Sequence, residues 1–515
     1  MTPTIEQMAF FAEVERGRGN ILLESVAGSG KTTSIVESLN YIDDTWPVLA
    51  CSFTKLAADQ LGERIRKQNF TNVTSSTLNS VGWGVCRNNI RGVQLDANKT
   101  LNILQAQLNR NCPTHLDKKK LYSALKGPVK RLVGLLKAYA EDPEQPELYS
   151  RIAEIAAYHS VDLAEGESSE AKYAREVTFN RVMAVYQQSV QTTAFMDFDD
   201  QKFMPVYYRW EMPSYRVIYV DECQDMSVCD IAMIERFKGA RIVFVGDRKQ
   251  AIYFFRGSQL NAMDTLLDKF RCNYKTLSVC FRCADDILIE AKEISPLIRS
   301  PEPNPKGKGV VEDVSTKEFL EKVAVGDYVI CRTTAPLIKR CLELVRKGKP
   351  AKVKGREVGR SLLDLIDKVA ERISGFDPAS NETLLEFLGA LSCHTTETVA
   401  RLEAAKLEDA AIRVLDESEA LNYFCLDCNC INEVADKIYD LFTDDGDDTK
   451  LILLLTAHKS KGLERDTVWF LRPDLVPFPR AKSEHEIQTE MNLKYVILTR
   501  AALNRFHVQK ETGEK

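Results

Sequence analysis

The chain has 515 residues, which at roughly 150 residues per domain corresponds to about three to four folded units. Hydrophobic residues make up 44% and charged residues 28%, a globular composition that excludes wholesale disorder, collagen-like repeats and a membrane bundle. The 69 Lys and Arg against 74 Asp and Glu leave a net charge of −5, so any contact with a polyanion has to be local.

No stretch is apolar over the ~20 residues that a membrane-spanning helix needs, and the glutamates within residues 1–20 do not fit a signal peptide. We therefore expect a cytoplasmic protein, in the host cytoplasm if a phage encodes it, with no membrane partner. The 14 cysteines are then expected to be reduced thiols.

Short apolar runs, each followed by a polar turn or a helical pattern, recur along the chain. The first run, residues 20–25, ends in a glycine-rich turn, after which residues 31–41 return to helical spacing. The later runs are residues 48–53, 217–220, 242–245, 328–331, 451–455 and 467–471. Alternating strands and helices predict an α/β fold with parallel sheets covered on both faces.

Two long stretches with an almost wholly helical pattern interrupt these strands. We expect a first α/β domain from residues 1–80 and 195–275, which carries residues 81–194 as a mainly helical insertion. A second α/β domain is expected from residues 276–360 and 450–515, with residues 361–449 as its own helical insertion.

The segment SVAGSGKTT, residues 25–33, places a lysine and a hydroxyl residue after a strand and at the start of a helix. Backbone N–H groups and the helix dipole favour phosphate there. Lys31 would then hold the β and γ phosphates of a nucleotide, and Thr32 would ligate Mg²⁺. A flexible structural loop is the alternative interpretation. The residues of the expected nucleotide loop are Ala27, Gly28, Ser29, Gly30, Lys31, Thr32 and Thr33.

Two acids follow the predicted strand at residues 217–220 in the segment VIYVDECQD. Asp221 can hold Mg²⁺, and Glu222 can orient and deprotonate an attacking water. An exposed acidic loop is the alternative, but the GKT segment on an earlier strand favours a shared phosphate site.

The motifs along the chain resemble those of the UvrD/Rep branch of superfamily 1 helicases. Residues 242–258 resemble its motif III, and DECQD resembles its DExQD motif. Other similar segments, in the expected order, are residues 6–11, 51–61 (motif Ia), 76–82 (motif Ib), 196–200 (the DF(D)D element), 277–283 (motif IV), 453–464 (motif V) and 490–501 (motif VI). The resemblance implies two RecA-like P-loop domains, in a build similar to compact, phage-encoded or F-box-associated members.

The same resemblance implies ATP with Mg²⁺ and assigns further residues to the nucleotide. Gln250 would sense the γ-phosphate, while Arg282 and Arg500 would act as arginine fingers. An arginine on the transferring phosphoryl group is worth ~10³ to 10⁵ in rate, whereas a solvated surface arginine, the alternative interpretation, adds almost nothing. The residues implied at the base and ribose are Gln7, Phe281 and Glu464.

Aromatic side chains of motifs III and Ia are expected to contact nucleic acid. By the resemblance Phe255 stacks on a base beside Arg256, with Tyr253 and Phe53 as further candidates. Stacking is worth ~1 to 3 kcal/mol per base and tolerates any sequence, which predicts single-stranded nucleic acid bound without base readout. Packing in the core beneath motif III is the alternative, above all for Phe254.

The resemblance alone assigns Thr77 and Asn79 to backbone phosphates and His458 to a link between the DNA and ATP sites. Two basic segments, residues 116–137 and 346–360, each carry a local excess of positive charge that would favour phosphate contact. A solvated helix face is the alternative for each of them.

A cysteine cluster in the second insertion, Cys425, Cys428 and Cys430, has Cys393 and His394 upstream of it. Such ligands can hold Zn²⁺, but this spacing is weak support and buried free cysteines are common. Reduced, metal-free thiols are therefore the favoured interpretation.

Together these expectations predict an ATP-dependent DNA helicase that moves along single-stranded DNA, 3′→5′ by the resemblance, and unwinds duplex junctions. The alternatives are a translocase that strips proteins without unwinding, an RNA helicase of the same superfamily, and a hydrolysis-dead, nucleotide-gated binding module. Single-strand-binding, replication or recombination proteins are the expected partners, with replication, repair and recombination open as pathways.

Overall fold

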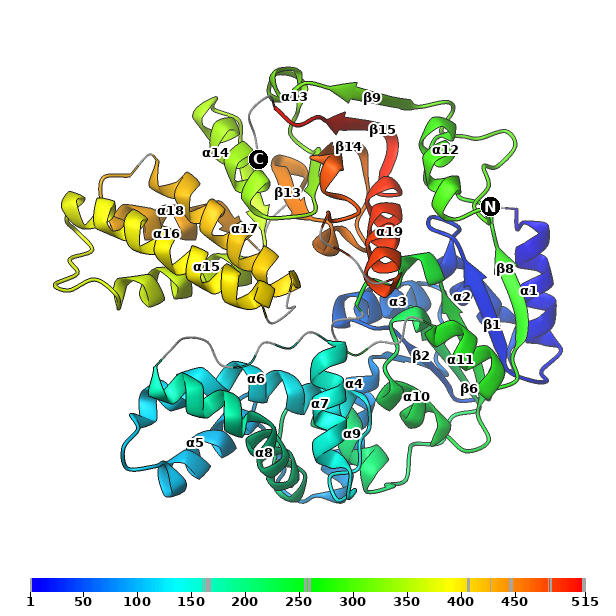
Figure 1. Cartoon of the computed structure of the whole chain (residues 1–515). Coiled ribbons are helices and arrows are strands. Elements are labelled where there is room, and N and C mark those ends of the chain that lie inside the picture. The colour runs from blue at the N-terminus through cyan, green and yellow to red at the C-terminus, as the bar shows by residue number, and fades with distance from the viewer. Residues whose placement is uncertain are drawn as a thin grey trace. The chain divides into compact units, whose positions relative to one another are not determined.

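The computed structural model describes residues 2–511 apart from 160, 162, 164–167, 254–256, 258–260, 405–407, 427, 444–447, 480 and 482–483. The chain divides into two compact units, shown in Figure 1. The first unit comprises Met1–Val26 and Gly30–Ser278, and the second comprises Ala27–Ser29 and Val279–Lys515.

The first unit is built on a six-stranded sheet in the order β3-β2-β6-β7-β1-β8, and every strand pair in it is parallel. The strands are β1 (Ile21–Ser25), β2 (Val48–Cys51), β3 (Val73–Ser76), β6 (Val217–Asp221), β7 (Arg241–Gly246) and β8 (Asn273–Leu277). Every residue of β1, β2 and β6 is buried, as expected for central strands covered on both faces. The predicted α/β class is therefore confirmed.

Hydrophobic cores form on both faces of this sheet because successive strand residues point to opposite sides. Leu22 belongs to one core, whereas Ile21 and Leu23 belong to the other. The helices around the sheet are α1 (Ile5–Glu15), α2 (Lys31–Ser38), α3 (Lys55–Lys67), α4 (Leu78–Asn89), α9 (Asp200–Tyr207), α10 (Val228–Glu235) and α11 (Ala262–Lys269).

Four further helices of the first unit pack around a core of their own and lie side by side in Figure 1. They are α5 (Lys99–Asn111), α6 (Lys118–Ala138), α7 (Leu148–Tyr158) and α8 (Ser169–Gln191). A short parallel ladder between β4 (Gln94–Leu95) and β5 (Phe195–Met196) brackets them. This core continues into α9 through Phe203, so the helical stretch is joined to the sheet-bearing part by apolar packing.

The second unit contains a seven-stranded parallel sheet in the order β12-β11-β13-β10-β14-β15-β9. Its strands are β9 (Val310–Val314), β10 (Tyr328–Cys331), β11 (Ala351–Lys354), β12 (Phe442–Thr443), β13 (Ile452–Thr456), β14 (Arg465–Leu471) and β15 (Ala501–Val508). The sequence did not predict β11, which lies in the basic segment 346–360. In this strand Ala351 and Val353 are buried, while the alternating Lys352 and Lys354 are half-exposed. The basic segment therefore contains a strand in which every second side chain points to the core.

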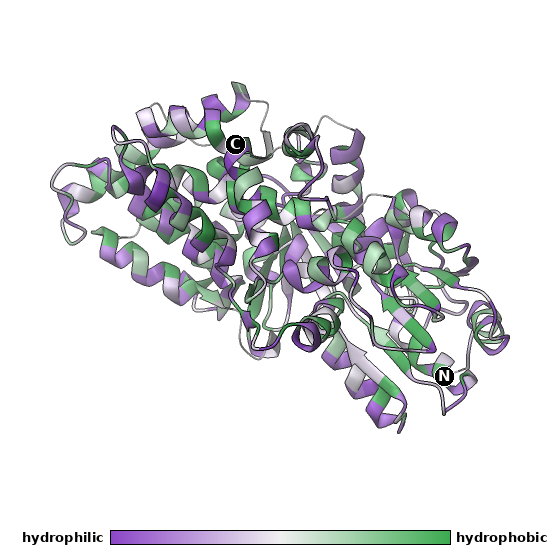
Figure 2. Ribbon diagram, turned by 90° about the horizontal axis from the view of Figure 1, so that it is seen from below, coloured by the Kyte–Doolittle hydropathy of each residue, from purple (hydrophilic) through white to green (hydrophobic). Residues whose placement is uncertain are grey.

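The helices of the second unit pack on that sheet and on one another. In Figure 2 the helical ribbons carry both hydrophobic and hydrophilic residues. They are α12 (Asp285–Ile294), α13 (Thr316–Lys322), α14 (Ala335–Arg346), α15 (Arg356–Ala370), α16 (Asn381–Ala404), α17 (Glu408–Cys425), α18 (Ile431–Leu441) and α19 (Glu484–Leu498). One continuous core joins Leu362, Phe387 and Leu421 of the insertion to Val329 and Ile452 of the sheet. The insertion and the sheet therefore share their hydrophobic stabilisation.

None of the described helices combines the length and the apolar character required to cross a bilayer.

Candidate functional site

The loop between β1 and α2 has the backbone of a phosphate-binding loop. Gly28 and Gly30 adopt positive φ angles of 68° and 81°, which favour glycine. Gly30 is also the N-cap of α2 and provides no side-chain cap for the N–H groups that begin the helix. The buried hydroxyl of Ser29 has no hydrogen-bond partner among the described residues. A helix N-terminus without a side-chain cap and an unpartnered hydroxyl beside it suit phosphate oxygens.

Lys31 begins α2 and forms an ion pair with Glu222, the residue after β6. Lys31 Nζ lies 3.1 Å from Glu222 Oε1. Burial lowers the pKa of Lys31, but the negative charges of Glu222, Asp221 and Asp247 outweigh it and hold that pKa above its ordinary value. The lysine is therefore charged, as phosphate binding requires. Glu222 itself sits in the left-handed region at φ 57°, a strained backbone of the kind that recurs at functional sites.

A chain of side-chain hydrogen bonds connects the acids after β6 with the loop after β7. The Gln224 amide donates through Nε2 to Glu222 Oε2 and accepts through Oε1 from the Asp247 N–H, 3.0 Å away. Asp247 in turn accepts from Gln250 Nε2 at 2.7 Å. Gly246 has to be small, because a Cβ there would lie 2.5 Å from Gln224 Oε1. The structure thus links Glu222 and Gln250 through two residues that the sequence reasoning did not single out.

Gln224 and Asp247 lie in DECQD and in the motif III segment, both of which resemble helicase motifs. Their place in these segments is the sequence signal by which they could have been found. Asp247 is buried, and burial raises the pKa of its carboxyl above the ordinary value. Its contacts with the Lys249 N–H at 3.0 Å and with Gln250 show that it shapes the short η3 turn (Arg248–Gln250).

Gln7 is buried on α1 beside the start of α2. Its Oε1 accepts from the Thr4 N–H at 2.9 Å, and its Nε2 donates to Ser34 Oγ at 3.0 Å. Gln7 therefore lies near Gly30, where a Cβ would come within 3.7 Å of Nε2. Thr32 and Thr33 follow Lys31 in α2; Thr32 is half-buried and Thr33 is exposed.

The donor set suits Mg²⁺ in kind. The Thr32 hydroxyl and the Asp221 carboxylate are hard oxygen ligands, which this cation prefers. Asp221 ends β6 and is buried, and its Oδ1 also accepts from the Glu222 N–H at 2.9 Å.

In the second unit, Arg282, Arg500 and Glu464 lie together. Arg282 forms an ion pair with Glu464 and donates through Nη1 to the Thr499 carbonyl at 3.1 Å. Arg500 is buried and donates to the carbonyls of Val496 and Leu463 at 2.8 and 3.0 Å. Burial first, and then the charge of Arg282, lower the pKa of Arg500. The sequence-predicted pair of arginines thus meets within one unit, and Phe281 precedes Arg282 as a half-buried ring.

The family follows from comparison with known proteins. Residues 9–271 match the UvrD/REP helicase N-terminal domain, and residues 248–506 match the UvrD-like helicase C-terminal domain. This chain belongs to the UvrD/Rep helicase family.

Several curated proteins are similar over part of the chain. The F-box DNA helicase protein 1 of Schizosaccharomyces pombe is 32% identical over 326 residues, which cover 58% of this chain and 35% of that protein. The ATP-dependent DNA helicase PcrA of Bacillus subtilis is 23% identical over 301 residues, 52% of this chain and 37% of PcrA. The Staphylococcus aureus PcrA is 23% identical over 313 residues, 57% of this chain and 40% of that protein. The chain thus covers well under half of the length of each relative.

Two aromatic residues that the UvrD/Rep resemblance assigned to nucleic acid lie against each other. The rings of Phe53 and Tyr253 stack, with centroids 5.7 Å apart and an interplanar angle of 11°. Phe255 and Arg256, assigned to the same function, lie outside the described residues, as does Phe254. In the second unit His458 is half-buried at the start of η6 (His458–Ser460), two positions after the last residue of β13.

The motif Ib residues are engaged by the protein itself. Thr77 is the N-cap of α4, and its hydroxyl accepts from the Ser80 N–H at 3.1 Å. Asn79 Nδ2 donates to the carbonyl of Phe198 at 2.8 Å. Phe198 belongs to the DF(D)D element, and the residue is 55% exposed. The motif alone assigns no role to Phe198, because the exposure of an aromatic ring cannot be read from a motif.

A cavity of about 680 Å³ opens between motifs Ia and Ib and helix α6. Its lining includes Phe53, Leu78 and Asn79 of motifs Ia and Ib and Lys130 and Arg131 of α6. The acids Asp199, Asp225 and Asp230 line it as well. Part of the predicted basic segment 116–137 therefore faces the residues assigned to nucleic acid.

The cysteine cluster of the second insertion gives no support for zinc. Within the described part of the chain, no group of three or more His, Cys, Asp and Glu side chains could hold a metal ion. Cys425 instead belongs to the hydrophobic core, and Cys428 packs against it.

Proposed function

We propose that this chain hydrolyses ATP with Mg²⁺ and uses the cycle to move along single-stranded DNA and open duplexes, as an ATP-dependent DNA helicase. The observation that carries the proposal is the largely buried Lys31–Glu222 pair, connected through Gln224 and Asp247 to Gln250. Those side chains come from three separate elements and converge at the ends of neighbouring strands, where nucleotide sites of parallel sheets lie.

In this proposal each residue has a distinct task. Lys31 and the N–H groups at the start of α2 hold the β and γ phosphates, and Thr32 and Asp221 hold the metal. Bound Mg²⁺ neutralises charge on the phosphates. Glu222 orients the attacking water and takes its proton, and Gln224 keeps that carboxylate in position.

Arg282 and Arg500 are proposed as the arginine fingers. An arginine at the transferring phosphoryl group stabilises the charge spread over its oxygens and contributes ~10³ to 10⁵ in rate, or roughly 4 to 7 kcal/mol. Support comes from their meeting beside Glu464, which the resemblance assigns to the ribose. We propose that Gln7 and Phe281 contact the adenine, because the resemblance assigns both residues to it.

On the nucleic-acid side we propose that Phe53, Tyr253 and Phe198 stack on bases, with Asn79 supporting Phe198. The stacked pair, the exposed ring of Phe198, and Lys130 and Arg131 in the cavity lining support binding without base readout. Thr77, His458, Phe255 and Arg256 keep their proposed contacts on the resemblance alone, as does 3′→5′ travel.

ATP hydrolysis in the presence and absence of oligothymidylate tests the activity. We expect stimulation by DNA in the native protein and a loss of roughly 10²- to 10⁴-fold in Glu222→Gln, because the general base is removed. Binding of ATP and of DNA should survive in that variant. Turnover in Glu222→Gln equal to that of the native protein would remove Glu222 from its role.

Strand displacement from 3′-tailed and 5′-tailed duplexes tests the mode. Release from the 3′-tailed duplex alone is expected. Equal release from both tails would contradict the direction, and DNA-stimulated hydrolysis without release would favour a translocase that does not unwind.

A further inference from the structure

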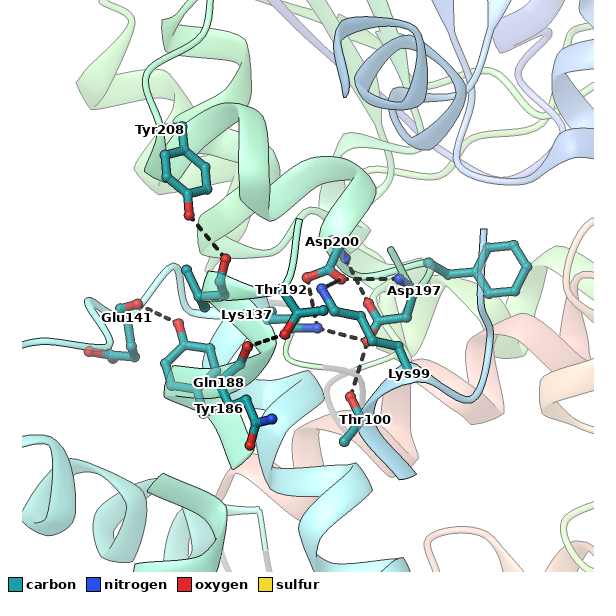
Figure 3. A network of polar contacts seen from close by, with 12 residues as sticks. Lys99, Thr100, Lys137, Glu141, Tyr186, Gln188, Thr192, Asp197, Asp200 and Tyr208 are labelled. Atoms are coloured by element: carbon teal, nitrogen blue, oxygen red, sulfur yellow. Dashed lines mark hydrogen bonds and ion pairs between the residues drawn. The ribbon is translucent and has the colours of Figure 1, made fainter. Parts of the chain in front are cut away.

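Four buried charges form a closed cluster between the helical insertion and the motif-bearing part of the first unit. This buried ion cluster consists of Lys99, Lys137, Asp197 and Asp200 (Figure 3). Lys99 Nζ lies 2.7 Å from Asp200 Oδ2, and Lys137 Nζ lies 2.7 Å from Asp197 Oδ2 and 2.8 Å from Asp200 Oδ1. Two positive and two negative charges make the cluster neutral overall.

Three of the four carboxylate oxygens also accept hydrogen bonds from nearby groups. The Asp197 N–H donates to Asp200 Oδ2 at 3.0 Å, and the Asp200 N–H donates to Asp197 Oδ1 at 2.9 Å. Thr100 Oγ1 donates to Asp197 Oδ2 at 3.1 Å. The fourth oxygen, Asp200 Oδ1, has no hydrogen-bond partner among the described residues and lies 2.8 Å from Lys137 Nζ as an ion pair. The two reciprocal N–H bonds close the turn from residue 197 to residue 200.

The two lysines come from the insertion, whereas the two aspartates flank the exposed ring. Lys99 is the first residue of α5, and Lys137 lies in the last turn of α6. Asp197 and Asp200 stand on either side of Phe198, whose carbonyl is held by Asn79. The turn that carries Phe198 is thus clamped by the insertion on one side and by motif Ib on the other.

The electrostatics favour a positioning role over a purely stabilising one. Burial would lower the pKa of Lys137, but Asp200 and Asp197 hold it above its ordinary value, so the ammonium stays charged. Taking such charges out of water offsets much of their attraction, and well-packed apolar side chains in their place are often neutral or better for stability. What four directional charges supply, and apolar packing does not, is a defined geometry for the turn.

We propose that Lys99 and Lys137 are positioning residues for nucleic-acid binding. They hold the 197–200 turn so that Phe198 and Asn79 present one surface to single-stranded DNA. Lys137 also lines the cavity that Phe53 and Asn79 line, which places the clamp beside the other proposed contacts. This inference rests on the proposed function, since it names residues that act through a proposed DNA contact.

A double-mutant cycle between Lys137→Met and Phe198→Ala tests the proposal. The Kd for fluorescently labelled oligothymidylate is measured by anisotropy, and DNA-independent ATP hydrolysis is measured on the same proteins. Each single variant is expected to raise the Kd about tenfold, the effect of one lost stacking contact. The double variant is expected to raise it no further, because Lys137 acts through Phe198. DNA-independent hydrolysis of Lys137→Met should stay within about twofold of native, since that substitution leaves the nucleotide residues intact.

Two other variants serve as a second test and as a control. Asp197→Asn keeps the size of the side chain and is expected to raise the Kd in the same direction, so that a failure of Lys137→Met to fold does not end the test. Lys67→Met removes an exposed lysine that pairs with Glu63 on α3, and should leave the Kd unchanged.

Full additivity of Lys137→Met with Phe198→Ala would overturn the proposal, as would an equal loss of DNA binding and DNA-independent hydrolysis. A different result would contradict the proposed function. If the native protein binds oligothymidylate but its ATP hydrolysis is not stimulated by it, the helicase proposal is wrong. The positioning of Phe198, measured by Kd, would stand in that case.

Discussion

Lys31 Nζ lies 3.1 Å from Glu222 Oε1, so the lysine that begins α2 and the acid that follows β6 form one largely buried ion pair. The other oxygen of Glu222 accepts from the Gln224 amide. Lys31 and Gln224 therefore hold the two carboxylate oxygens of Glu222 in place within the protein itself.

Replacing Gln224 with Leu should separate binding from chemistry. The variant loses both the donor to Glu222 and the acceptor for the Asp247 N–H. We expect kcat for ATP hydrolysis to fall roughly 10- to 100-fold, because a misplaced general base costs about that much. The KM for ATP should change less than about twofold, since Lys31 is untouched. A steady-state titration of ATP checks both values, and a rise in KM at constant kcat would contradict the assignment.

Gly82 on α4 tests how closely motif Ib packs on the DF(D)D side of the unit. A Cβ at this position would lie 1.9 Å from the carbonyl oxygen of Gln201 on α9. Gly82→Ala is therefore expected to destabilise the protein by about 1 to 3 kcal/mol, the usual cost of overpacking. Urea unfolding followed by circular dichroism measures it.

Gly84 on the same helix is the matched control, because a Cβ there meets nothing within 4 Å. Gly84→Ala should stabilise the protein by about 0.5 to 1 kcal/mol through helix propensity. The same sign for both substitutions would show that α4 and α9 do not pack as described.

The Phe53–Tyr253 stack predicts how DNA affinity depends on sequence. Phe53→Ala should weaken binding of single strands about tenfold, and by the same factor for oligothymidylate and for a mixed sequence, because stacking does not read base edges. Anisotropy titrations with both oligonucleotides check this. Tyr149→Ala, at an aromatic residue of α7 that is 44% exposed, should leave both affinities unchanged.

His159 predicts a pH dependence of stability. Burial first, and then the charge of Arg131, lower the pKa of this histidine to about 4 from an ordinary 6.5. The folded protein thus keeps His159 neutral, whereas the unfolded chain protonates it below about pH 6.5. The contribution of His159 to the free energy of unfolding is therefore fully present above pH 6.5 and is lost as the pH falls towards 4.

At 1.36 kcal/mol per pKa unit, the loss between pH 7 and pH 4.5 amounts to about 2 to 3 kcal/mol. Because other groups titrate in this range, the measurement is the difference between native protein and His159→Gln in urea unfolding at the two pH values. An identical loss in both proteins would mean that His159 does not carry the effect.

Much of the site was predictable because its signals are local. A glycine-rich turn between an apolar run and a helical pattern predicted the phosphate loop, and an apolar run ending in Asp221 and Glu222 predicted the acids. The strand β11 was missed because its alternating lysines resembled a charged surface. Gln224 and Asp247 lay inside quoted motifs, but their mutual contact crosses from β6 to β7 and has no signature along the chain.

The sequence by itself determined the α/β class, the glycine-rich loop between β1 and α2 and the individual UvrD/Rep motifs, since each strand, turn or motif is recognised from residues within a few positions of one another. Only the tertiary structure decided that Thr77 caps a helix, that Asn79 holds Phe198, and that two lysines from separate helices close on Asp197 and Asp200. Contacts of that kind depend on how distant helices pack, and packing is set by the shapes of many side chains together.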